Sequence, residues 1–272
     1  MDETQAAPLP LAAPGTERAG EPYPTASLSF PEAIPRSLPR WLAAAQVIAI
    51  CGVPTQLVVF AVLALASGQP ILAGDGISIQ FFATVSLLDT AVVAILIRLF
   101  LALSGESSRS VFLGRRPVLG EIWRGMALLP VVMFAVTAVV LGVRTMAPWT
   151  HTVKNNPFEA FMQTPLDAAI FIIVVVVAGG VREELQRAFI LHRFEQRLGG
   201  IRVGLAVFSV TFGALHLVDQ GVDVAIAVGL LGLFWGVMYM RRRSAILAMT
   251  NHAAFDAAQV AQALLVRAFG GV

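Results

Sequence analysis

Charged side chains are scarce in this 272-residue chain. Asp, Glu, Lys and Arg supply 13% of the residues and hydrophobic types supply 57%, whereas a soluble domain is typically about 25% charged. This shortage argues against a soluble globular protein and favours a surface that faces lipid. The formal net charge is only +2, and no basic patch is interleaved with aromatic residues. We therefore predict no nucleic-acid partner.

Cysteine is almost absent. The single Cys51 excludes an internal disulfide. Because it lies in an apolar stretch, we expect it to be a small buried side chain rather than a nucleophile.

The first 36 residues lack long apolar runs and are rich in proline. Such a segment cannot bury enough apolar area to offset its chain entropy, which predicts a disordered tail over 1–36. It has no basic start and no apolar run before residue 41, so we do not expect a signal peptide. Residues 37–272 are expected to form a polytopic membrane domain.

Long apolar runs dominate the rest of the chain. A helix needs about 20 apolar residues to cross about 30 Å of hydrocarbon, and these runs are too long for barrel strands. They predict an all-α integral membrane protein with a bundle of about seven to eight transmembrane helices. The seven runs are 41–67, 77–103, 126–147, 166–190, 201–217, 222–240 and 244–268. Several arginines in 105–125 favour an interfacial segment there over an eighth span.

Arginine is concentrated in alternate loops. One set includes Arg36, Arg115, Arg193 and Arg242, while the other set carries Lys154 and little else. By the positive-inside rule this alternation predicts seven crossings and a cytoplasmic N-terminus.

Ionisable residues inside spans are costly and usually functional, and here most of them fall into three clusters. In the first, Arg187 follows Glu183 and Glu184 at helical spacing and can pair with either. Two adjacent carboxylates do not both ionise easily in a dry site, and this is how a general base for neutral pH arises. The alternative is a helix end with solvated charges. Outside the clusters, Asp89 is isolated and Asp167 is expected to start a helix.

The other two clusters contain histidine. Phe212 precedes His216 by four residues, and His252 precedes Asp256 by four, so each pair shares a helical face. An Asp at that position can hold an imidazole in one tautomer. Hydrogen-bonded packing residues are the alternative interpretation of both pairs.

Helix geometry links the clusters. We expect an antiparallel hairpin that turns at Gly199–Gly200, with Glu183 and His216 each about 16 residues from the turn. His252 lies about ten residues into the last span. Three helices thus place Glu183, His216 and His252 at one level, roughly 15 Å below the cytoplasmic boundary, which favours a shared site.

The three motifs resemble those of the CAAX-protease and bacteriocin-processing (CPBP, or Abi) family of intramembrane endopeptidases. The resemblance covers about 115–268 and rests on the Glu pair followed by Arg, on Phe-x-x-x-His and on His-x-x-x-Asp. One position departs from the family pattern. The family's Arg usually falls five residues after the first Glu, where this chain has Ala188, so that Arg187 comes one residue early.

The resemblance implies a role for each residue. Glu183, aided by His216, would activate a water for attack on a peptide carbonyl. His252 would stabilise the oxyanion and Asp256 would orient His252, while Glu184 would pair with Arg187. The substrate would be a membrane-associated peptide or protein tail, with or without a lipid modification.

Two points stay open at this level. The set Glu183, His216 and His252 also suits a catalytic zinc with an open position, in which case Glu184 would be the base; otherwise no cofactor is expected. A non-catalytic membrane partner or immunity-type protein on the same fold, or a proton-coupled transporter, is the alternative function. Against the transporter, the polar residues cluster in one half of the chain and no inverted repeat is visible.

Overall fold

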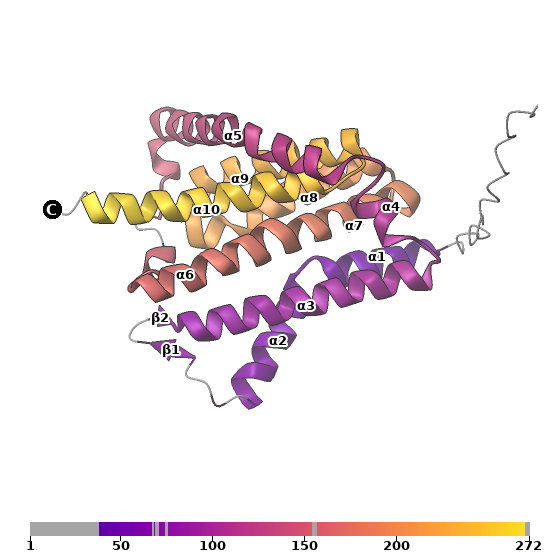
Figure 1. The fold of residues 1–272 in the computed structure, drawn as a ribbon, viewed down its shortest axis with the longest axis horizontal. Coiled ribbons are helices and arrows are strands. Elements are labelled where there is room, and N and C mark those ends of the chain that lie inside the picture. The colour runs from indigo at the N-terminus through magenta and orange to yellow at the C-terminus, as the bar shows by residue number, and fades with distance from the viewer. Residues whose placement is uncertain (1–37, 67, 69–70, 74–75, 154–156, 270–272) are drawn as a thin grey trace, which may run out of the picture. The chain divides into compact units, whose positions relative to one another are not determined.

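The computed structural model describes residues 38–66, 68, 71–73, 76–153 and 157–269. The predicted disordered tail, 1–36, lies outside the described residues. In chain order the elements are α1 (Arg40–Ile50), α2 (Val53–Ala66), β1 (Leu72–Ala73), β2 (Gly76–Ile77), α3 (Ile79–Leu103), α4 (Ser108–Phe112), α5 (Val118–Met146), η1 (Pro148–Thr150), η2 (Pro157–Phe161), α6 (Pro165–Val174), η3 (Val175–Arg182), α7 (Glu183–Arg197), α8 (Ile201–Leu215), α9 (Leu217–Arg242) and α10 (Ile246–Phe269). Figure 1 shows their arrangement.

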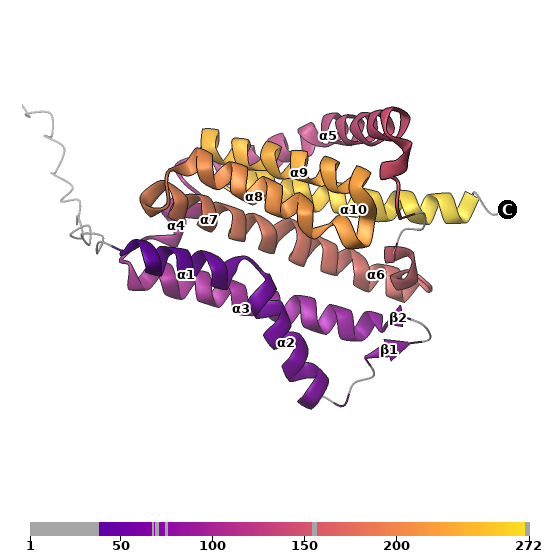
Figure 2. The same cartoon turned by 180° about the vertical axis from the view of Figure 1, so that it is seen from behind.

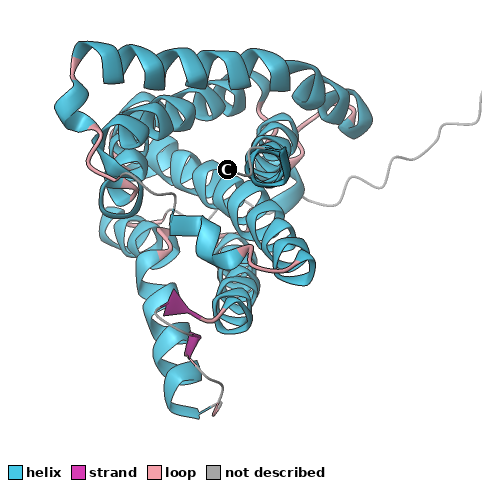
Figure 3. Ribbon diagram, turned by 90° about the vertical axis from the view of Figure 1, so that its left-hand side faces the viewer, coloured by secondary structure: helices cyan, strands magenta, loops and turns pink. Residues whose placement is uncertain are grey.

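The predicted all-α class is confirmed. Helices make up nearly all of the described chain, as Figure 3 shows, and its strands are the two-residue β1 and β2 of one small antiparallel hairpin. Among the described residues, four segments are long and apolar enough to cross a membrane: α3, α5, the continuous rod of α6, η3 and α7, and α9. Together α1 and α2 would make a fifth, although they are bent by 49°. The protein is therefore a multi-pass integral membrane protein.

The predicted count of seven to eight transmembrane helices is not confirmed. The run predicted as 201–217 forms α8, whose 15 residues rise only about 22 Å, less than the thickness of a hydrocarbon core. The run predicted as 244–268 forms α10, which is long but carries Asn251, His252, Asp256 and Gln259. These polar residues lower its hydropathy below that of the four long apolar segments.

A break in the first predicted span corrects the prediction for Cys51. The turn between α1 and α2 contains Gly52 with φ of +95°, and Cys51 at this turn is exposed rather than buried. Its Sγ lies 3.1 Å from the carbonyl oxygen of Ile48.

The rod of α6, η3 and α7 carries the Glu pair near its middle. It begins with a capping box, in which Thr164 Oγ1 accepts from the amide of Asp167 and the Asp167 carboxylate accepts from the amide of Thr164. This confirms Asp167 as a helix-start residue. The segment η3, which directly precedes Glu183, is a π-helix. Such wide turns are common at functional sites.

The hairpin predicted at Gly199–Gly200 is present. Both glycines have positive φ, +98° and +100°, a conformation that a side chain would strain. Helix α8 then runs beside α9, as Figure 2 shows from behind, and Gly232 and Gly236 of α9 face Phe212 and Leu205 of α8 at close range. These glycines let α8 and α9 approach closely.

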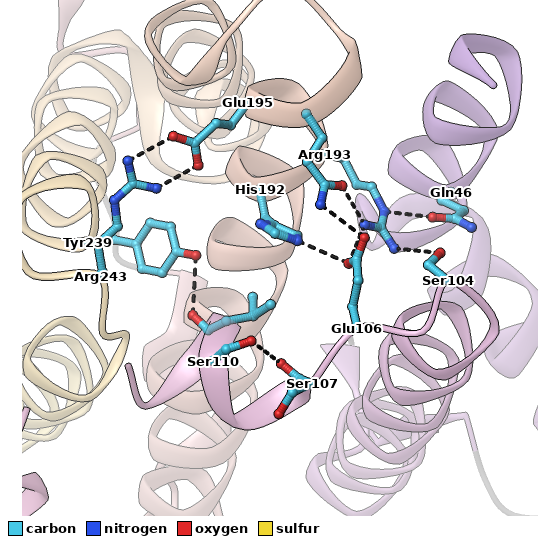
Figure 4. Close-up of polar contacts among 12 residues, drawn as sticks. Gln46, Ser104, Glu106, Ser107, Ser110, His192, Arg193, Glu195, Tyr239 and Arg243 are labelled. Carbon is cyan, nitrogen blue, oxygen red and sulfur yellow. Dashed lines mark hydrogen bonds and ion pairs between the residues drawn. The ribbon is translucent and has the colours of Figure 1, made fainter. Parts of the chain in front are cut away.

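A polar cluster near Gly199, shown in Figure 4, ties α7 to the end of α3. Glu106 accepts from Arg193 (2.7 Å) and Gln196 (2.9 Å) and lies 3.0 Å from His192 Nε2, while Arg193 also donates to Gln46 of α1. Burial opposes ionisation of Glu106, but the hydrogen bonds from His192, Arg193 and Gln196 prevail and lower its pKa to about 2. The cluster fixes α7, and with it the rod that carries the Glu pair, against α1 and α3.

Candidate active site

A cavity of about 620 Å³ lies between η3, α8, α9 and α10. It is lined by Glu183, His216, His252 and Asp256 together. The structure therefore brings the three sequence clusters to one place, as the depth argument predicts. Large apolar side chains line much of the remaining wall, as is typical of ligand-binding pockets.

His252 is at the centre of the site. Its Nδ1 lies 2.9 Å from Glu184 Oε1, and its Nε2 lies 3.5 Å from Asp256 Oδ2 and 3.9 Å from Glu183 Oε2. An ionised carboxylate can only accept a hydrogen bond, so Nδ1 of His252 carries the hydrogen in its bond to Glu184. This leaves Nε2 on the side of Glu183 and Asp256, and it is the atom available for chemistry.

The orienting partner of His252 therefore differs from the one that the resemblance implies. The direct bond to the imidazole comes from Glu184, whereas Asp256 lies on the Nε2 side at 3.5 Å, too far for a good hydrogen bond. The carboxylate of Asp256 packs close to Gly179 of η3, where a Cβ would clash with it. Asp256 thus faces the same space as Glu183, from the opposite helix.

Glu184 is itself held by Arg187. The two side chains are buried and form an ion pair. The guanidinium carbon lies 4.8, 5.0 and 5.4 Å from the ring centroids of Phe208, Phe212 and Trp235. These aromatic faces stabilise the cation where water cannot reach it. Although Arg187 comes one residue early, it makes the ion pair with Glu184 that helical spacing allows.

Arg182 and Asp89 belong to the site, although sequence reasoning assigned them no role in it. Arg182 Nη1 donates to Asp89 Oδ2 of α3 at 2.5 Å, and Arg182 Nη2 lies 3.6 Å from Glu183 Oε1. The Asp89 side chain is fully buried. Arg182 therefore fixes Glu183 from one side, and Asp89 fixes Arg182. The sequence did carry a signal for this pair. Asp89 is the one acid in the run 79–103, and a charge inside a span requires a partner, so a cation close to Asp89 could have been expected.

Trp235 is a third residue of the site to which the sequence assigned no role. Its ring is stacked on the imidazole of His252, with centroids 3.8 Å apart and planes 19° apart. Its Nε1 donates to Asn251 Oδ1 (2.8 Å), and Asn251 Nδ2 donates to the carbonyl oxygen of Gly125 in α5 (2.9 Å). The imidazole is thus held flat against an indole that is anchored to α5.

His216 ends α8 at the edge of the cavity. Its Nδ1 lies 2.8 Å from the carbonyl oxygen of Phe212, and because a carbonyl oxygen only accepts, Nδ1 carries the hydrogen. The free nitrogen, Nε2, can then accept a proton. Phe212 therefore contacts His216 through this backbone bond as well as through its ring, with centroids 5.1 Å apart.

Close helix contact explains how Glu183 reaches the site. A Cβ at Gly180 would clash with Ala253 of α10, both its backbone and its side chain. Only glycine lets the π-helical turn approach α10 this closely, and the approach places Glu183 beside His252.

The described residues contain no group of three or more His, Cys, Asp or Glu side chains arranged to hold a metal ion. The set Glu183, His216 and His252 lines one cavity, but in this geometry it does not form such a group. The zinc alternative therefore stays a prediction.

Residues 165–258 match the family model of type II CAAX prenyl endopeptidase Rce1-like proteins. The matched segment contains every predicted site residue and lies inside the predicted core of about 115–268. It confirms the resemblance of this chain to the CAAX-protease family. Comparison with curated proteins and with solved structures found no match.

Proposed function

We propose that this protein is an intramembrane endopeptidase that hydrolyses a peptide bond in a membrane-associated peptide or protein tail. The observation that carries the proposal is the cavity in which Glu183, His216, His252 and Asp256 meet. The match to the CAAX endopeptidase family supports the same conclusion.

In the proposed reaction Glu183 is the general base. A water that contacts both Glu183 Oε2 and His252 Nε2, which lie 3.9 Å apart, can give its proton to the Glu183 carboxylate and attack the peptide carbonyl carbon. Protonated Glu183 then returns the proton to the leaving nitrogen, so that the products are a carboxylate and an amine. His216, with Nε2 free, aids the transfer from the other side.

His252 is proposed to stabilise the tetrahedral intermediate. When its Nε2 carries a proton, it donates to the oxyanion, while Nδ1–H stays bonded to Glu184. Arg187 balances the charge of Glu184, so the imidazole keeps one orientation through the reaction. Asp256 does not contact the substrate oxyanion in this scheme, because its charge would repel the oxyanion; it acts only through Nε2 of His252.

We also propose that the N-terminus faces the cytoplasm. Arg193 near the end of α7 pairs with Glu106 just after α3, and Arg243 just after α9 pairs with Glu195 of α7, so these arginines lie at one end of the bundle. This supports the orientation under the positive-inside rule. The substrate class is a peptide or protein tail near lipid, with or without a lipid modification.

Cleavage by the full-length protein in detergent or in liposomes tests the function. Wild type is compared with Glu183→Gln, His252→Ala and His216→Ala on a library of lipidated and unmodified peptides. We expect Glu183→Gln and His252→Ala to lower kcat by at least about 100-fold, since they remove the base and the oxyanion donor. His216→Ala should have a smaller effect.

Glu195→Gln is the matched control. Glu195 lies on the same helix as Glu183 and pairs with Arg243 outside the cavity, so its loss should leave kcat unchanged. A chelator arm tests the zinc alternative. If folded wild type cuts no peptide in the library, the proposed function is wrong and a non-catalytic membrane partner becomes the better interpretation.

A further inference from the structure

A second recess lies at the end of the bundle that we assign to the cytoplasm, apart from the active-site cavity. It has a volume of about 570 Å³ and lies where the start of α1 meets the end of α7 and the Gly199–Gly200 turn. Arg197, in its wall, is fourteen residues beyond Glu183 along α7, which is about 21 Å of helix. No described residue lines both the recess and the cavity.

Two arginines from different helices line this recess. Arg40 is the first residue of α1 and Arg197 is the last residue of α7. Within the described residues, neither side chain makes a hydrogen bond or an ion pair. Each guanidinium group therefore keeps its five N–H donors for water or for a ligand.

The other charged and amide side chains of the recess already have partners. Both carboxylate oxygens of Glu195 accept from Arg243, at 2.5 and 2.7 Å, as Figure 4 shows. Gln196 accepts from Arg193 and donates to Glu106, each at 2.9 Å. Because Arg243 offsets the charge of Glu195, the recess as a whole is positively charged.

No described carboxylate at this end of the bundle is left to balance that charge. The described carboxylates there belong to Glu106, Glu121 and Glu195, and each is bonded to an arginine outside the recess. The charges of Arg40 and Arg197 are therefore unbalanced within the described chain. An anion that enters the recess gains from both of them.

The surroundings of the recess indicate which kind of anion fits. Trp41, next to Arg40, is 71% exposed, and tryptophan in membrane proteins is enriched at the level of the lipid headgroups. Leu38 and Pro39 add an apolar wall beside the two arginines. Anionic phospholipids combine a phosphate with apolar chains, and basic pockets at the ends of membrane helices bind their headgroups.

We propose that Arg40 and Arg197 bind the phosphate of an anionic lipid headgroup in the leaflet at this end of the bundle. The bound lipid links α1 to α7, the helix that carries Glu183 and Glu184. The site is independent of the proposed function, because no residue of the recess takes part in the hydrolysis.

Lipid binding to the full chain tests the site without reference to catalysis. The protein in phosphatidylcholine micelles is titrated with phosphatidylglycerol, and native mass spectrometry gives the Kd of the first bound lipid. Each arginine near a membrane surface contributes about fivefold to the affinity for an anionic lipid, so wild type should prefer phosphatidylglycerol to phosphatidylcholine by about 25-fold. Arg40→Gln and Arg197→Gln should each lose about fivefold, and the double variant should lose nearly the whole preference.

Arg116→Gln is the matched control, because Arg116 lies at the same end, is exposed and does not line the recess. It removes the same charge and should leave the preference of wild type intact. The site would be overturned by equal binding of the two lipids, by a preference that survives the double substitution, or by an equal loss in Arg116→Gln.

Inorganic phosphate separates a lipid site from a site for a soluble anion. At the concentration of the lipid it should leave phosphatidylglycerol bound, since it lacks the acyl chains that hold a lipid beside Trp41. Displacement of the lipid by inorganic phosphate would assign the recess to a soluble phosphate and overturn the proposal.

Discussion

The buried pair of Asp89 and Arg182 supports a quantitative prediction. Asp89 is fully buried, and Arg182 is 12% exposed and donates to it at 2.5 Å. Removing one member leaves the other as a buried charge with its main partner gone. Such a loss costs about 3–5 kcal/mol. We therefore expect Asp89→Leu or Arg182→Leu alone to destabilise the protein by about this amount.

The double variant should behave differently. With both charges replaced by apolar groups, no ion remains without its partner, and replacing a whole buried pair is often close to neutral. The Asp89→Leu/Arg182→Leu variant should thus recover at least about 2 kcal/mol relative to the sum of the single variants. Unfolding in mixed micelles, followed by tryptophan fluorescence, measures all four proteins.

Catalytic activity gives a second test of the role of the Asp89–Arg182 pair. Without Asp89, Arg182 is free to close on Glu183, now 3.6 Å away, and a closer cation weakens the carboxylate as a base. We expect kcat of Asp89→Asn to fall about 10- to 100-fold, with the acid limb of its pH profile moved to lower pH. Additive single effects on stability, together with an unchanged pH profile, would refute the reasoning that this pair supports Glu183.

Three more perturbations follow from the contacts. The lowered pKa of Glu106 stabilises the fold above its ordinary value of 4.5, so wild type should exceed Glu106→Gln by up to about 3 kcal/mol at pH 7. This advantage should fade in acid denaturation scans between pH 4.5 and about 2. Gly180→Ala should cost about 1–3 kcal/mol in thermal unfolding because its Cβ meets the backbone of α10, whereas Gly142→Ala, with no atom within 4 Å, should be neutral or stabilising. Trp235→Leu removes the face on which His252 rests, and kcat should fall about tenfold with KM little changed; a pure KM effect would contradict the positioning role.

Much of the site could be predicted because the constant rise per residue of a helix gives the depth of each residue in the membrane from its position in the sequence. Glu183 and His216 are equidistant from a glycine turn, and a constant rise per residue then brings them level. The ion pair between Glu184 and Arg187 follows from the same regularity. Local spacing on helices is information that a single sequence carries well.

Other features depend on contacts that no local pattern records. Asp89 and Arg182 are 93 residues apart, and neither is part of a recognised motif. The orientation of His252 by Glu184 rather than Asp256 depends on how α7 and α10 cross, and this crossing depends on a π-helical turn that has no clear sequence signature. The bend at Gly52 did have a signal, since Pro54 follows it closely, but the long apolar run concealed it.

The shortness of α8 has a consequence for the surrounding lipid. Its 15 residues reach about 22 Å, so the turn from His216 to Gly221 falls short of a hydrocarbon core about 30 Å thick. Lipid cannot satisfy the polar groups of that turn, and the bilayer must thin or admit solvent around it. Such local thinning of the bilayer would bring the aqueous phase close to the cavity. The proposed hydrolysis consumes water, and a helix too short to cross the bilayer gives water a route to Glu183.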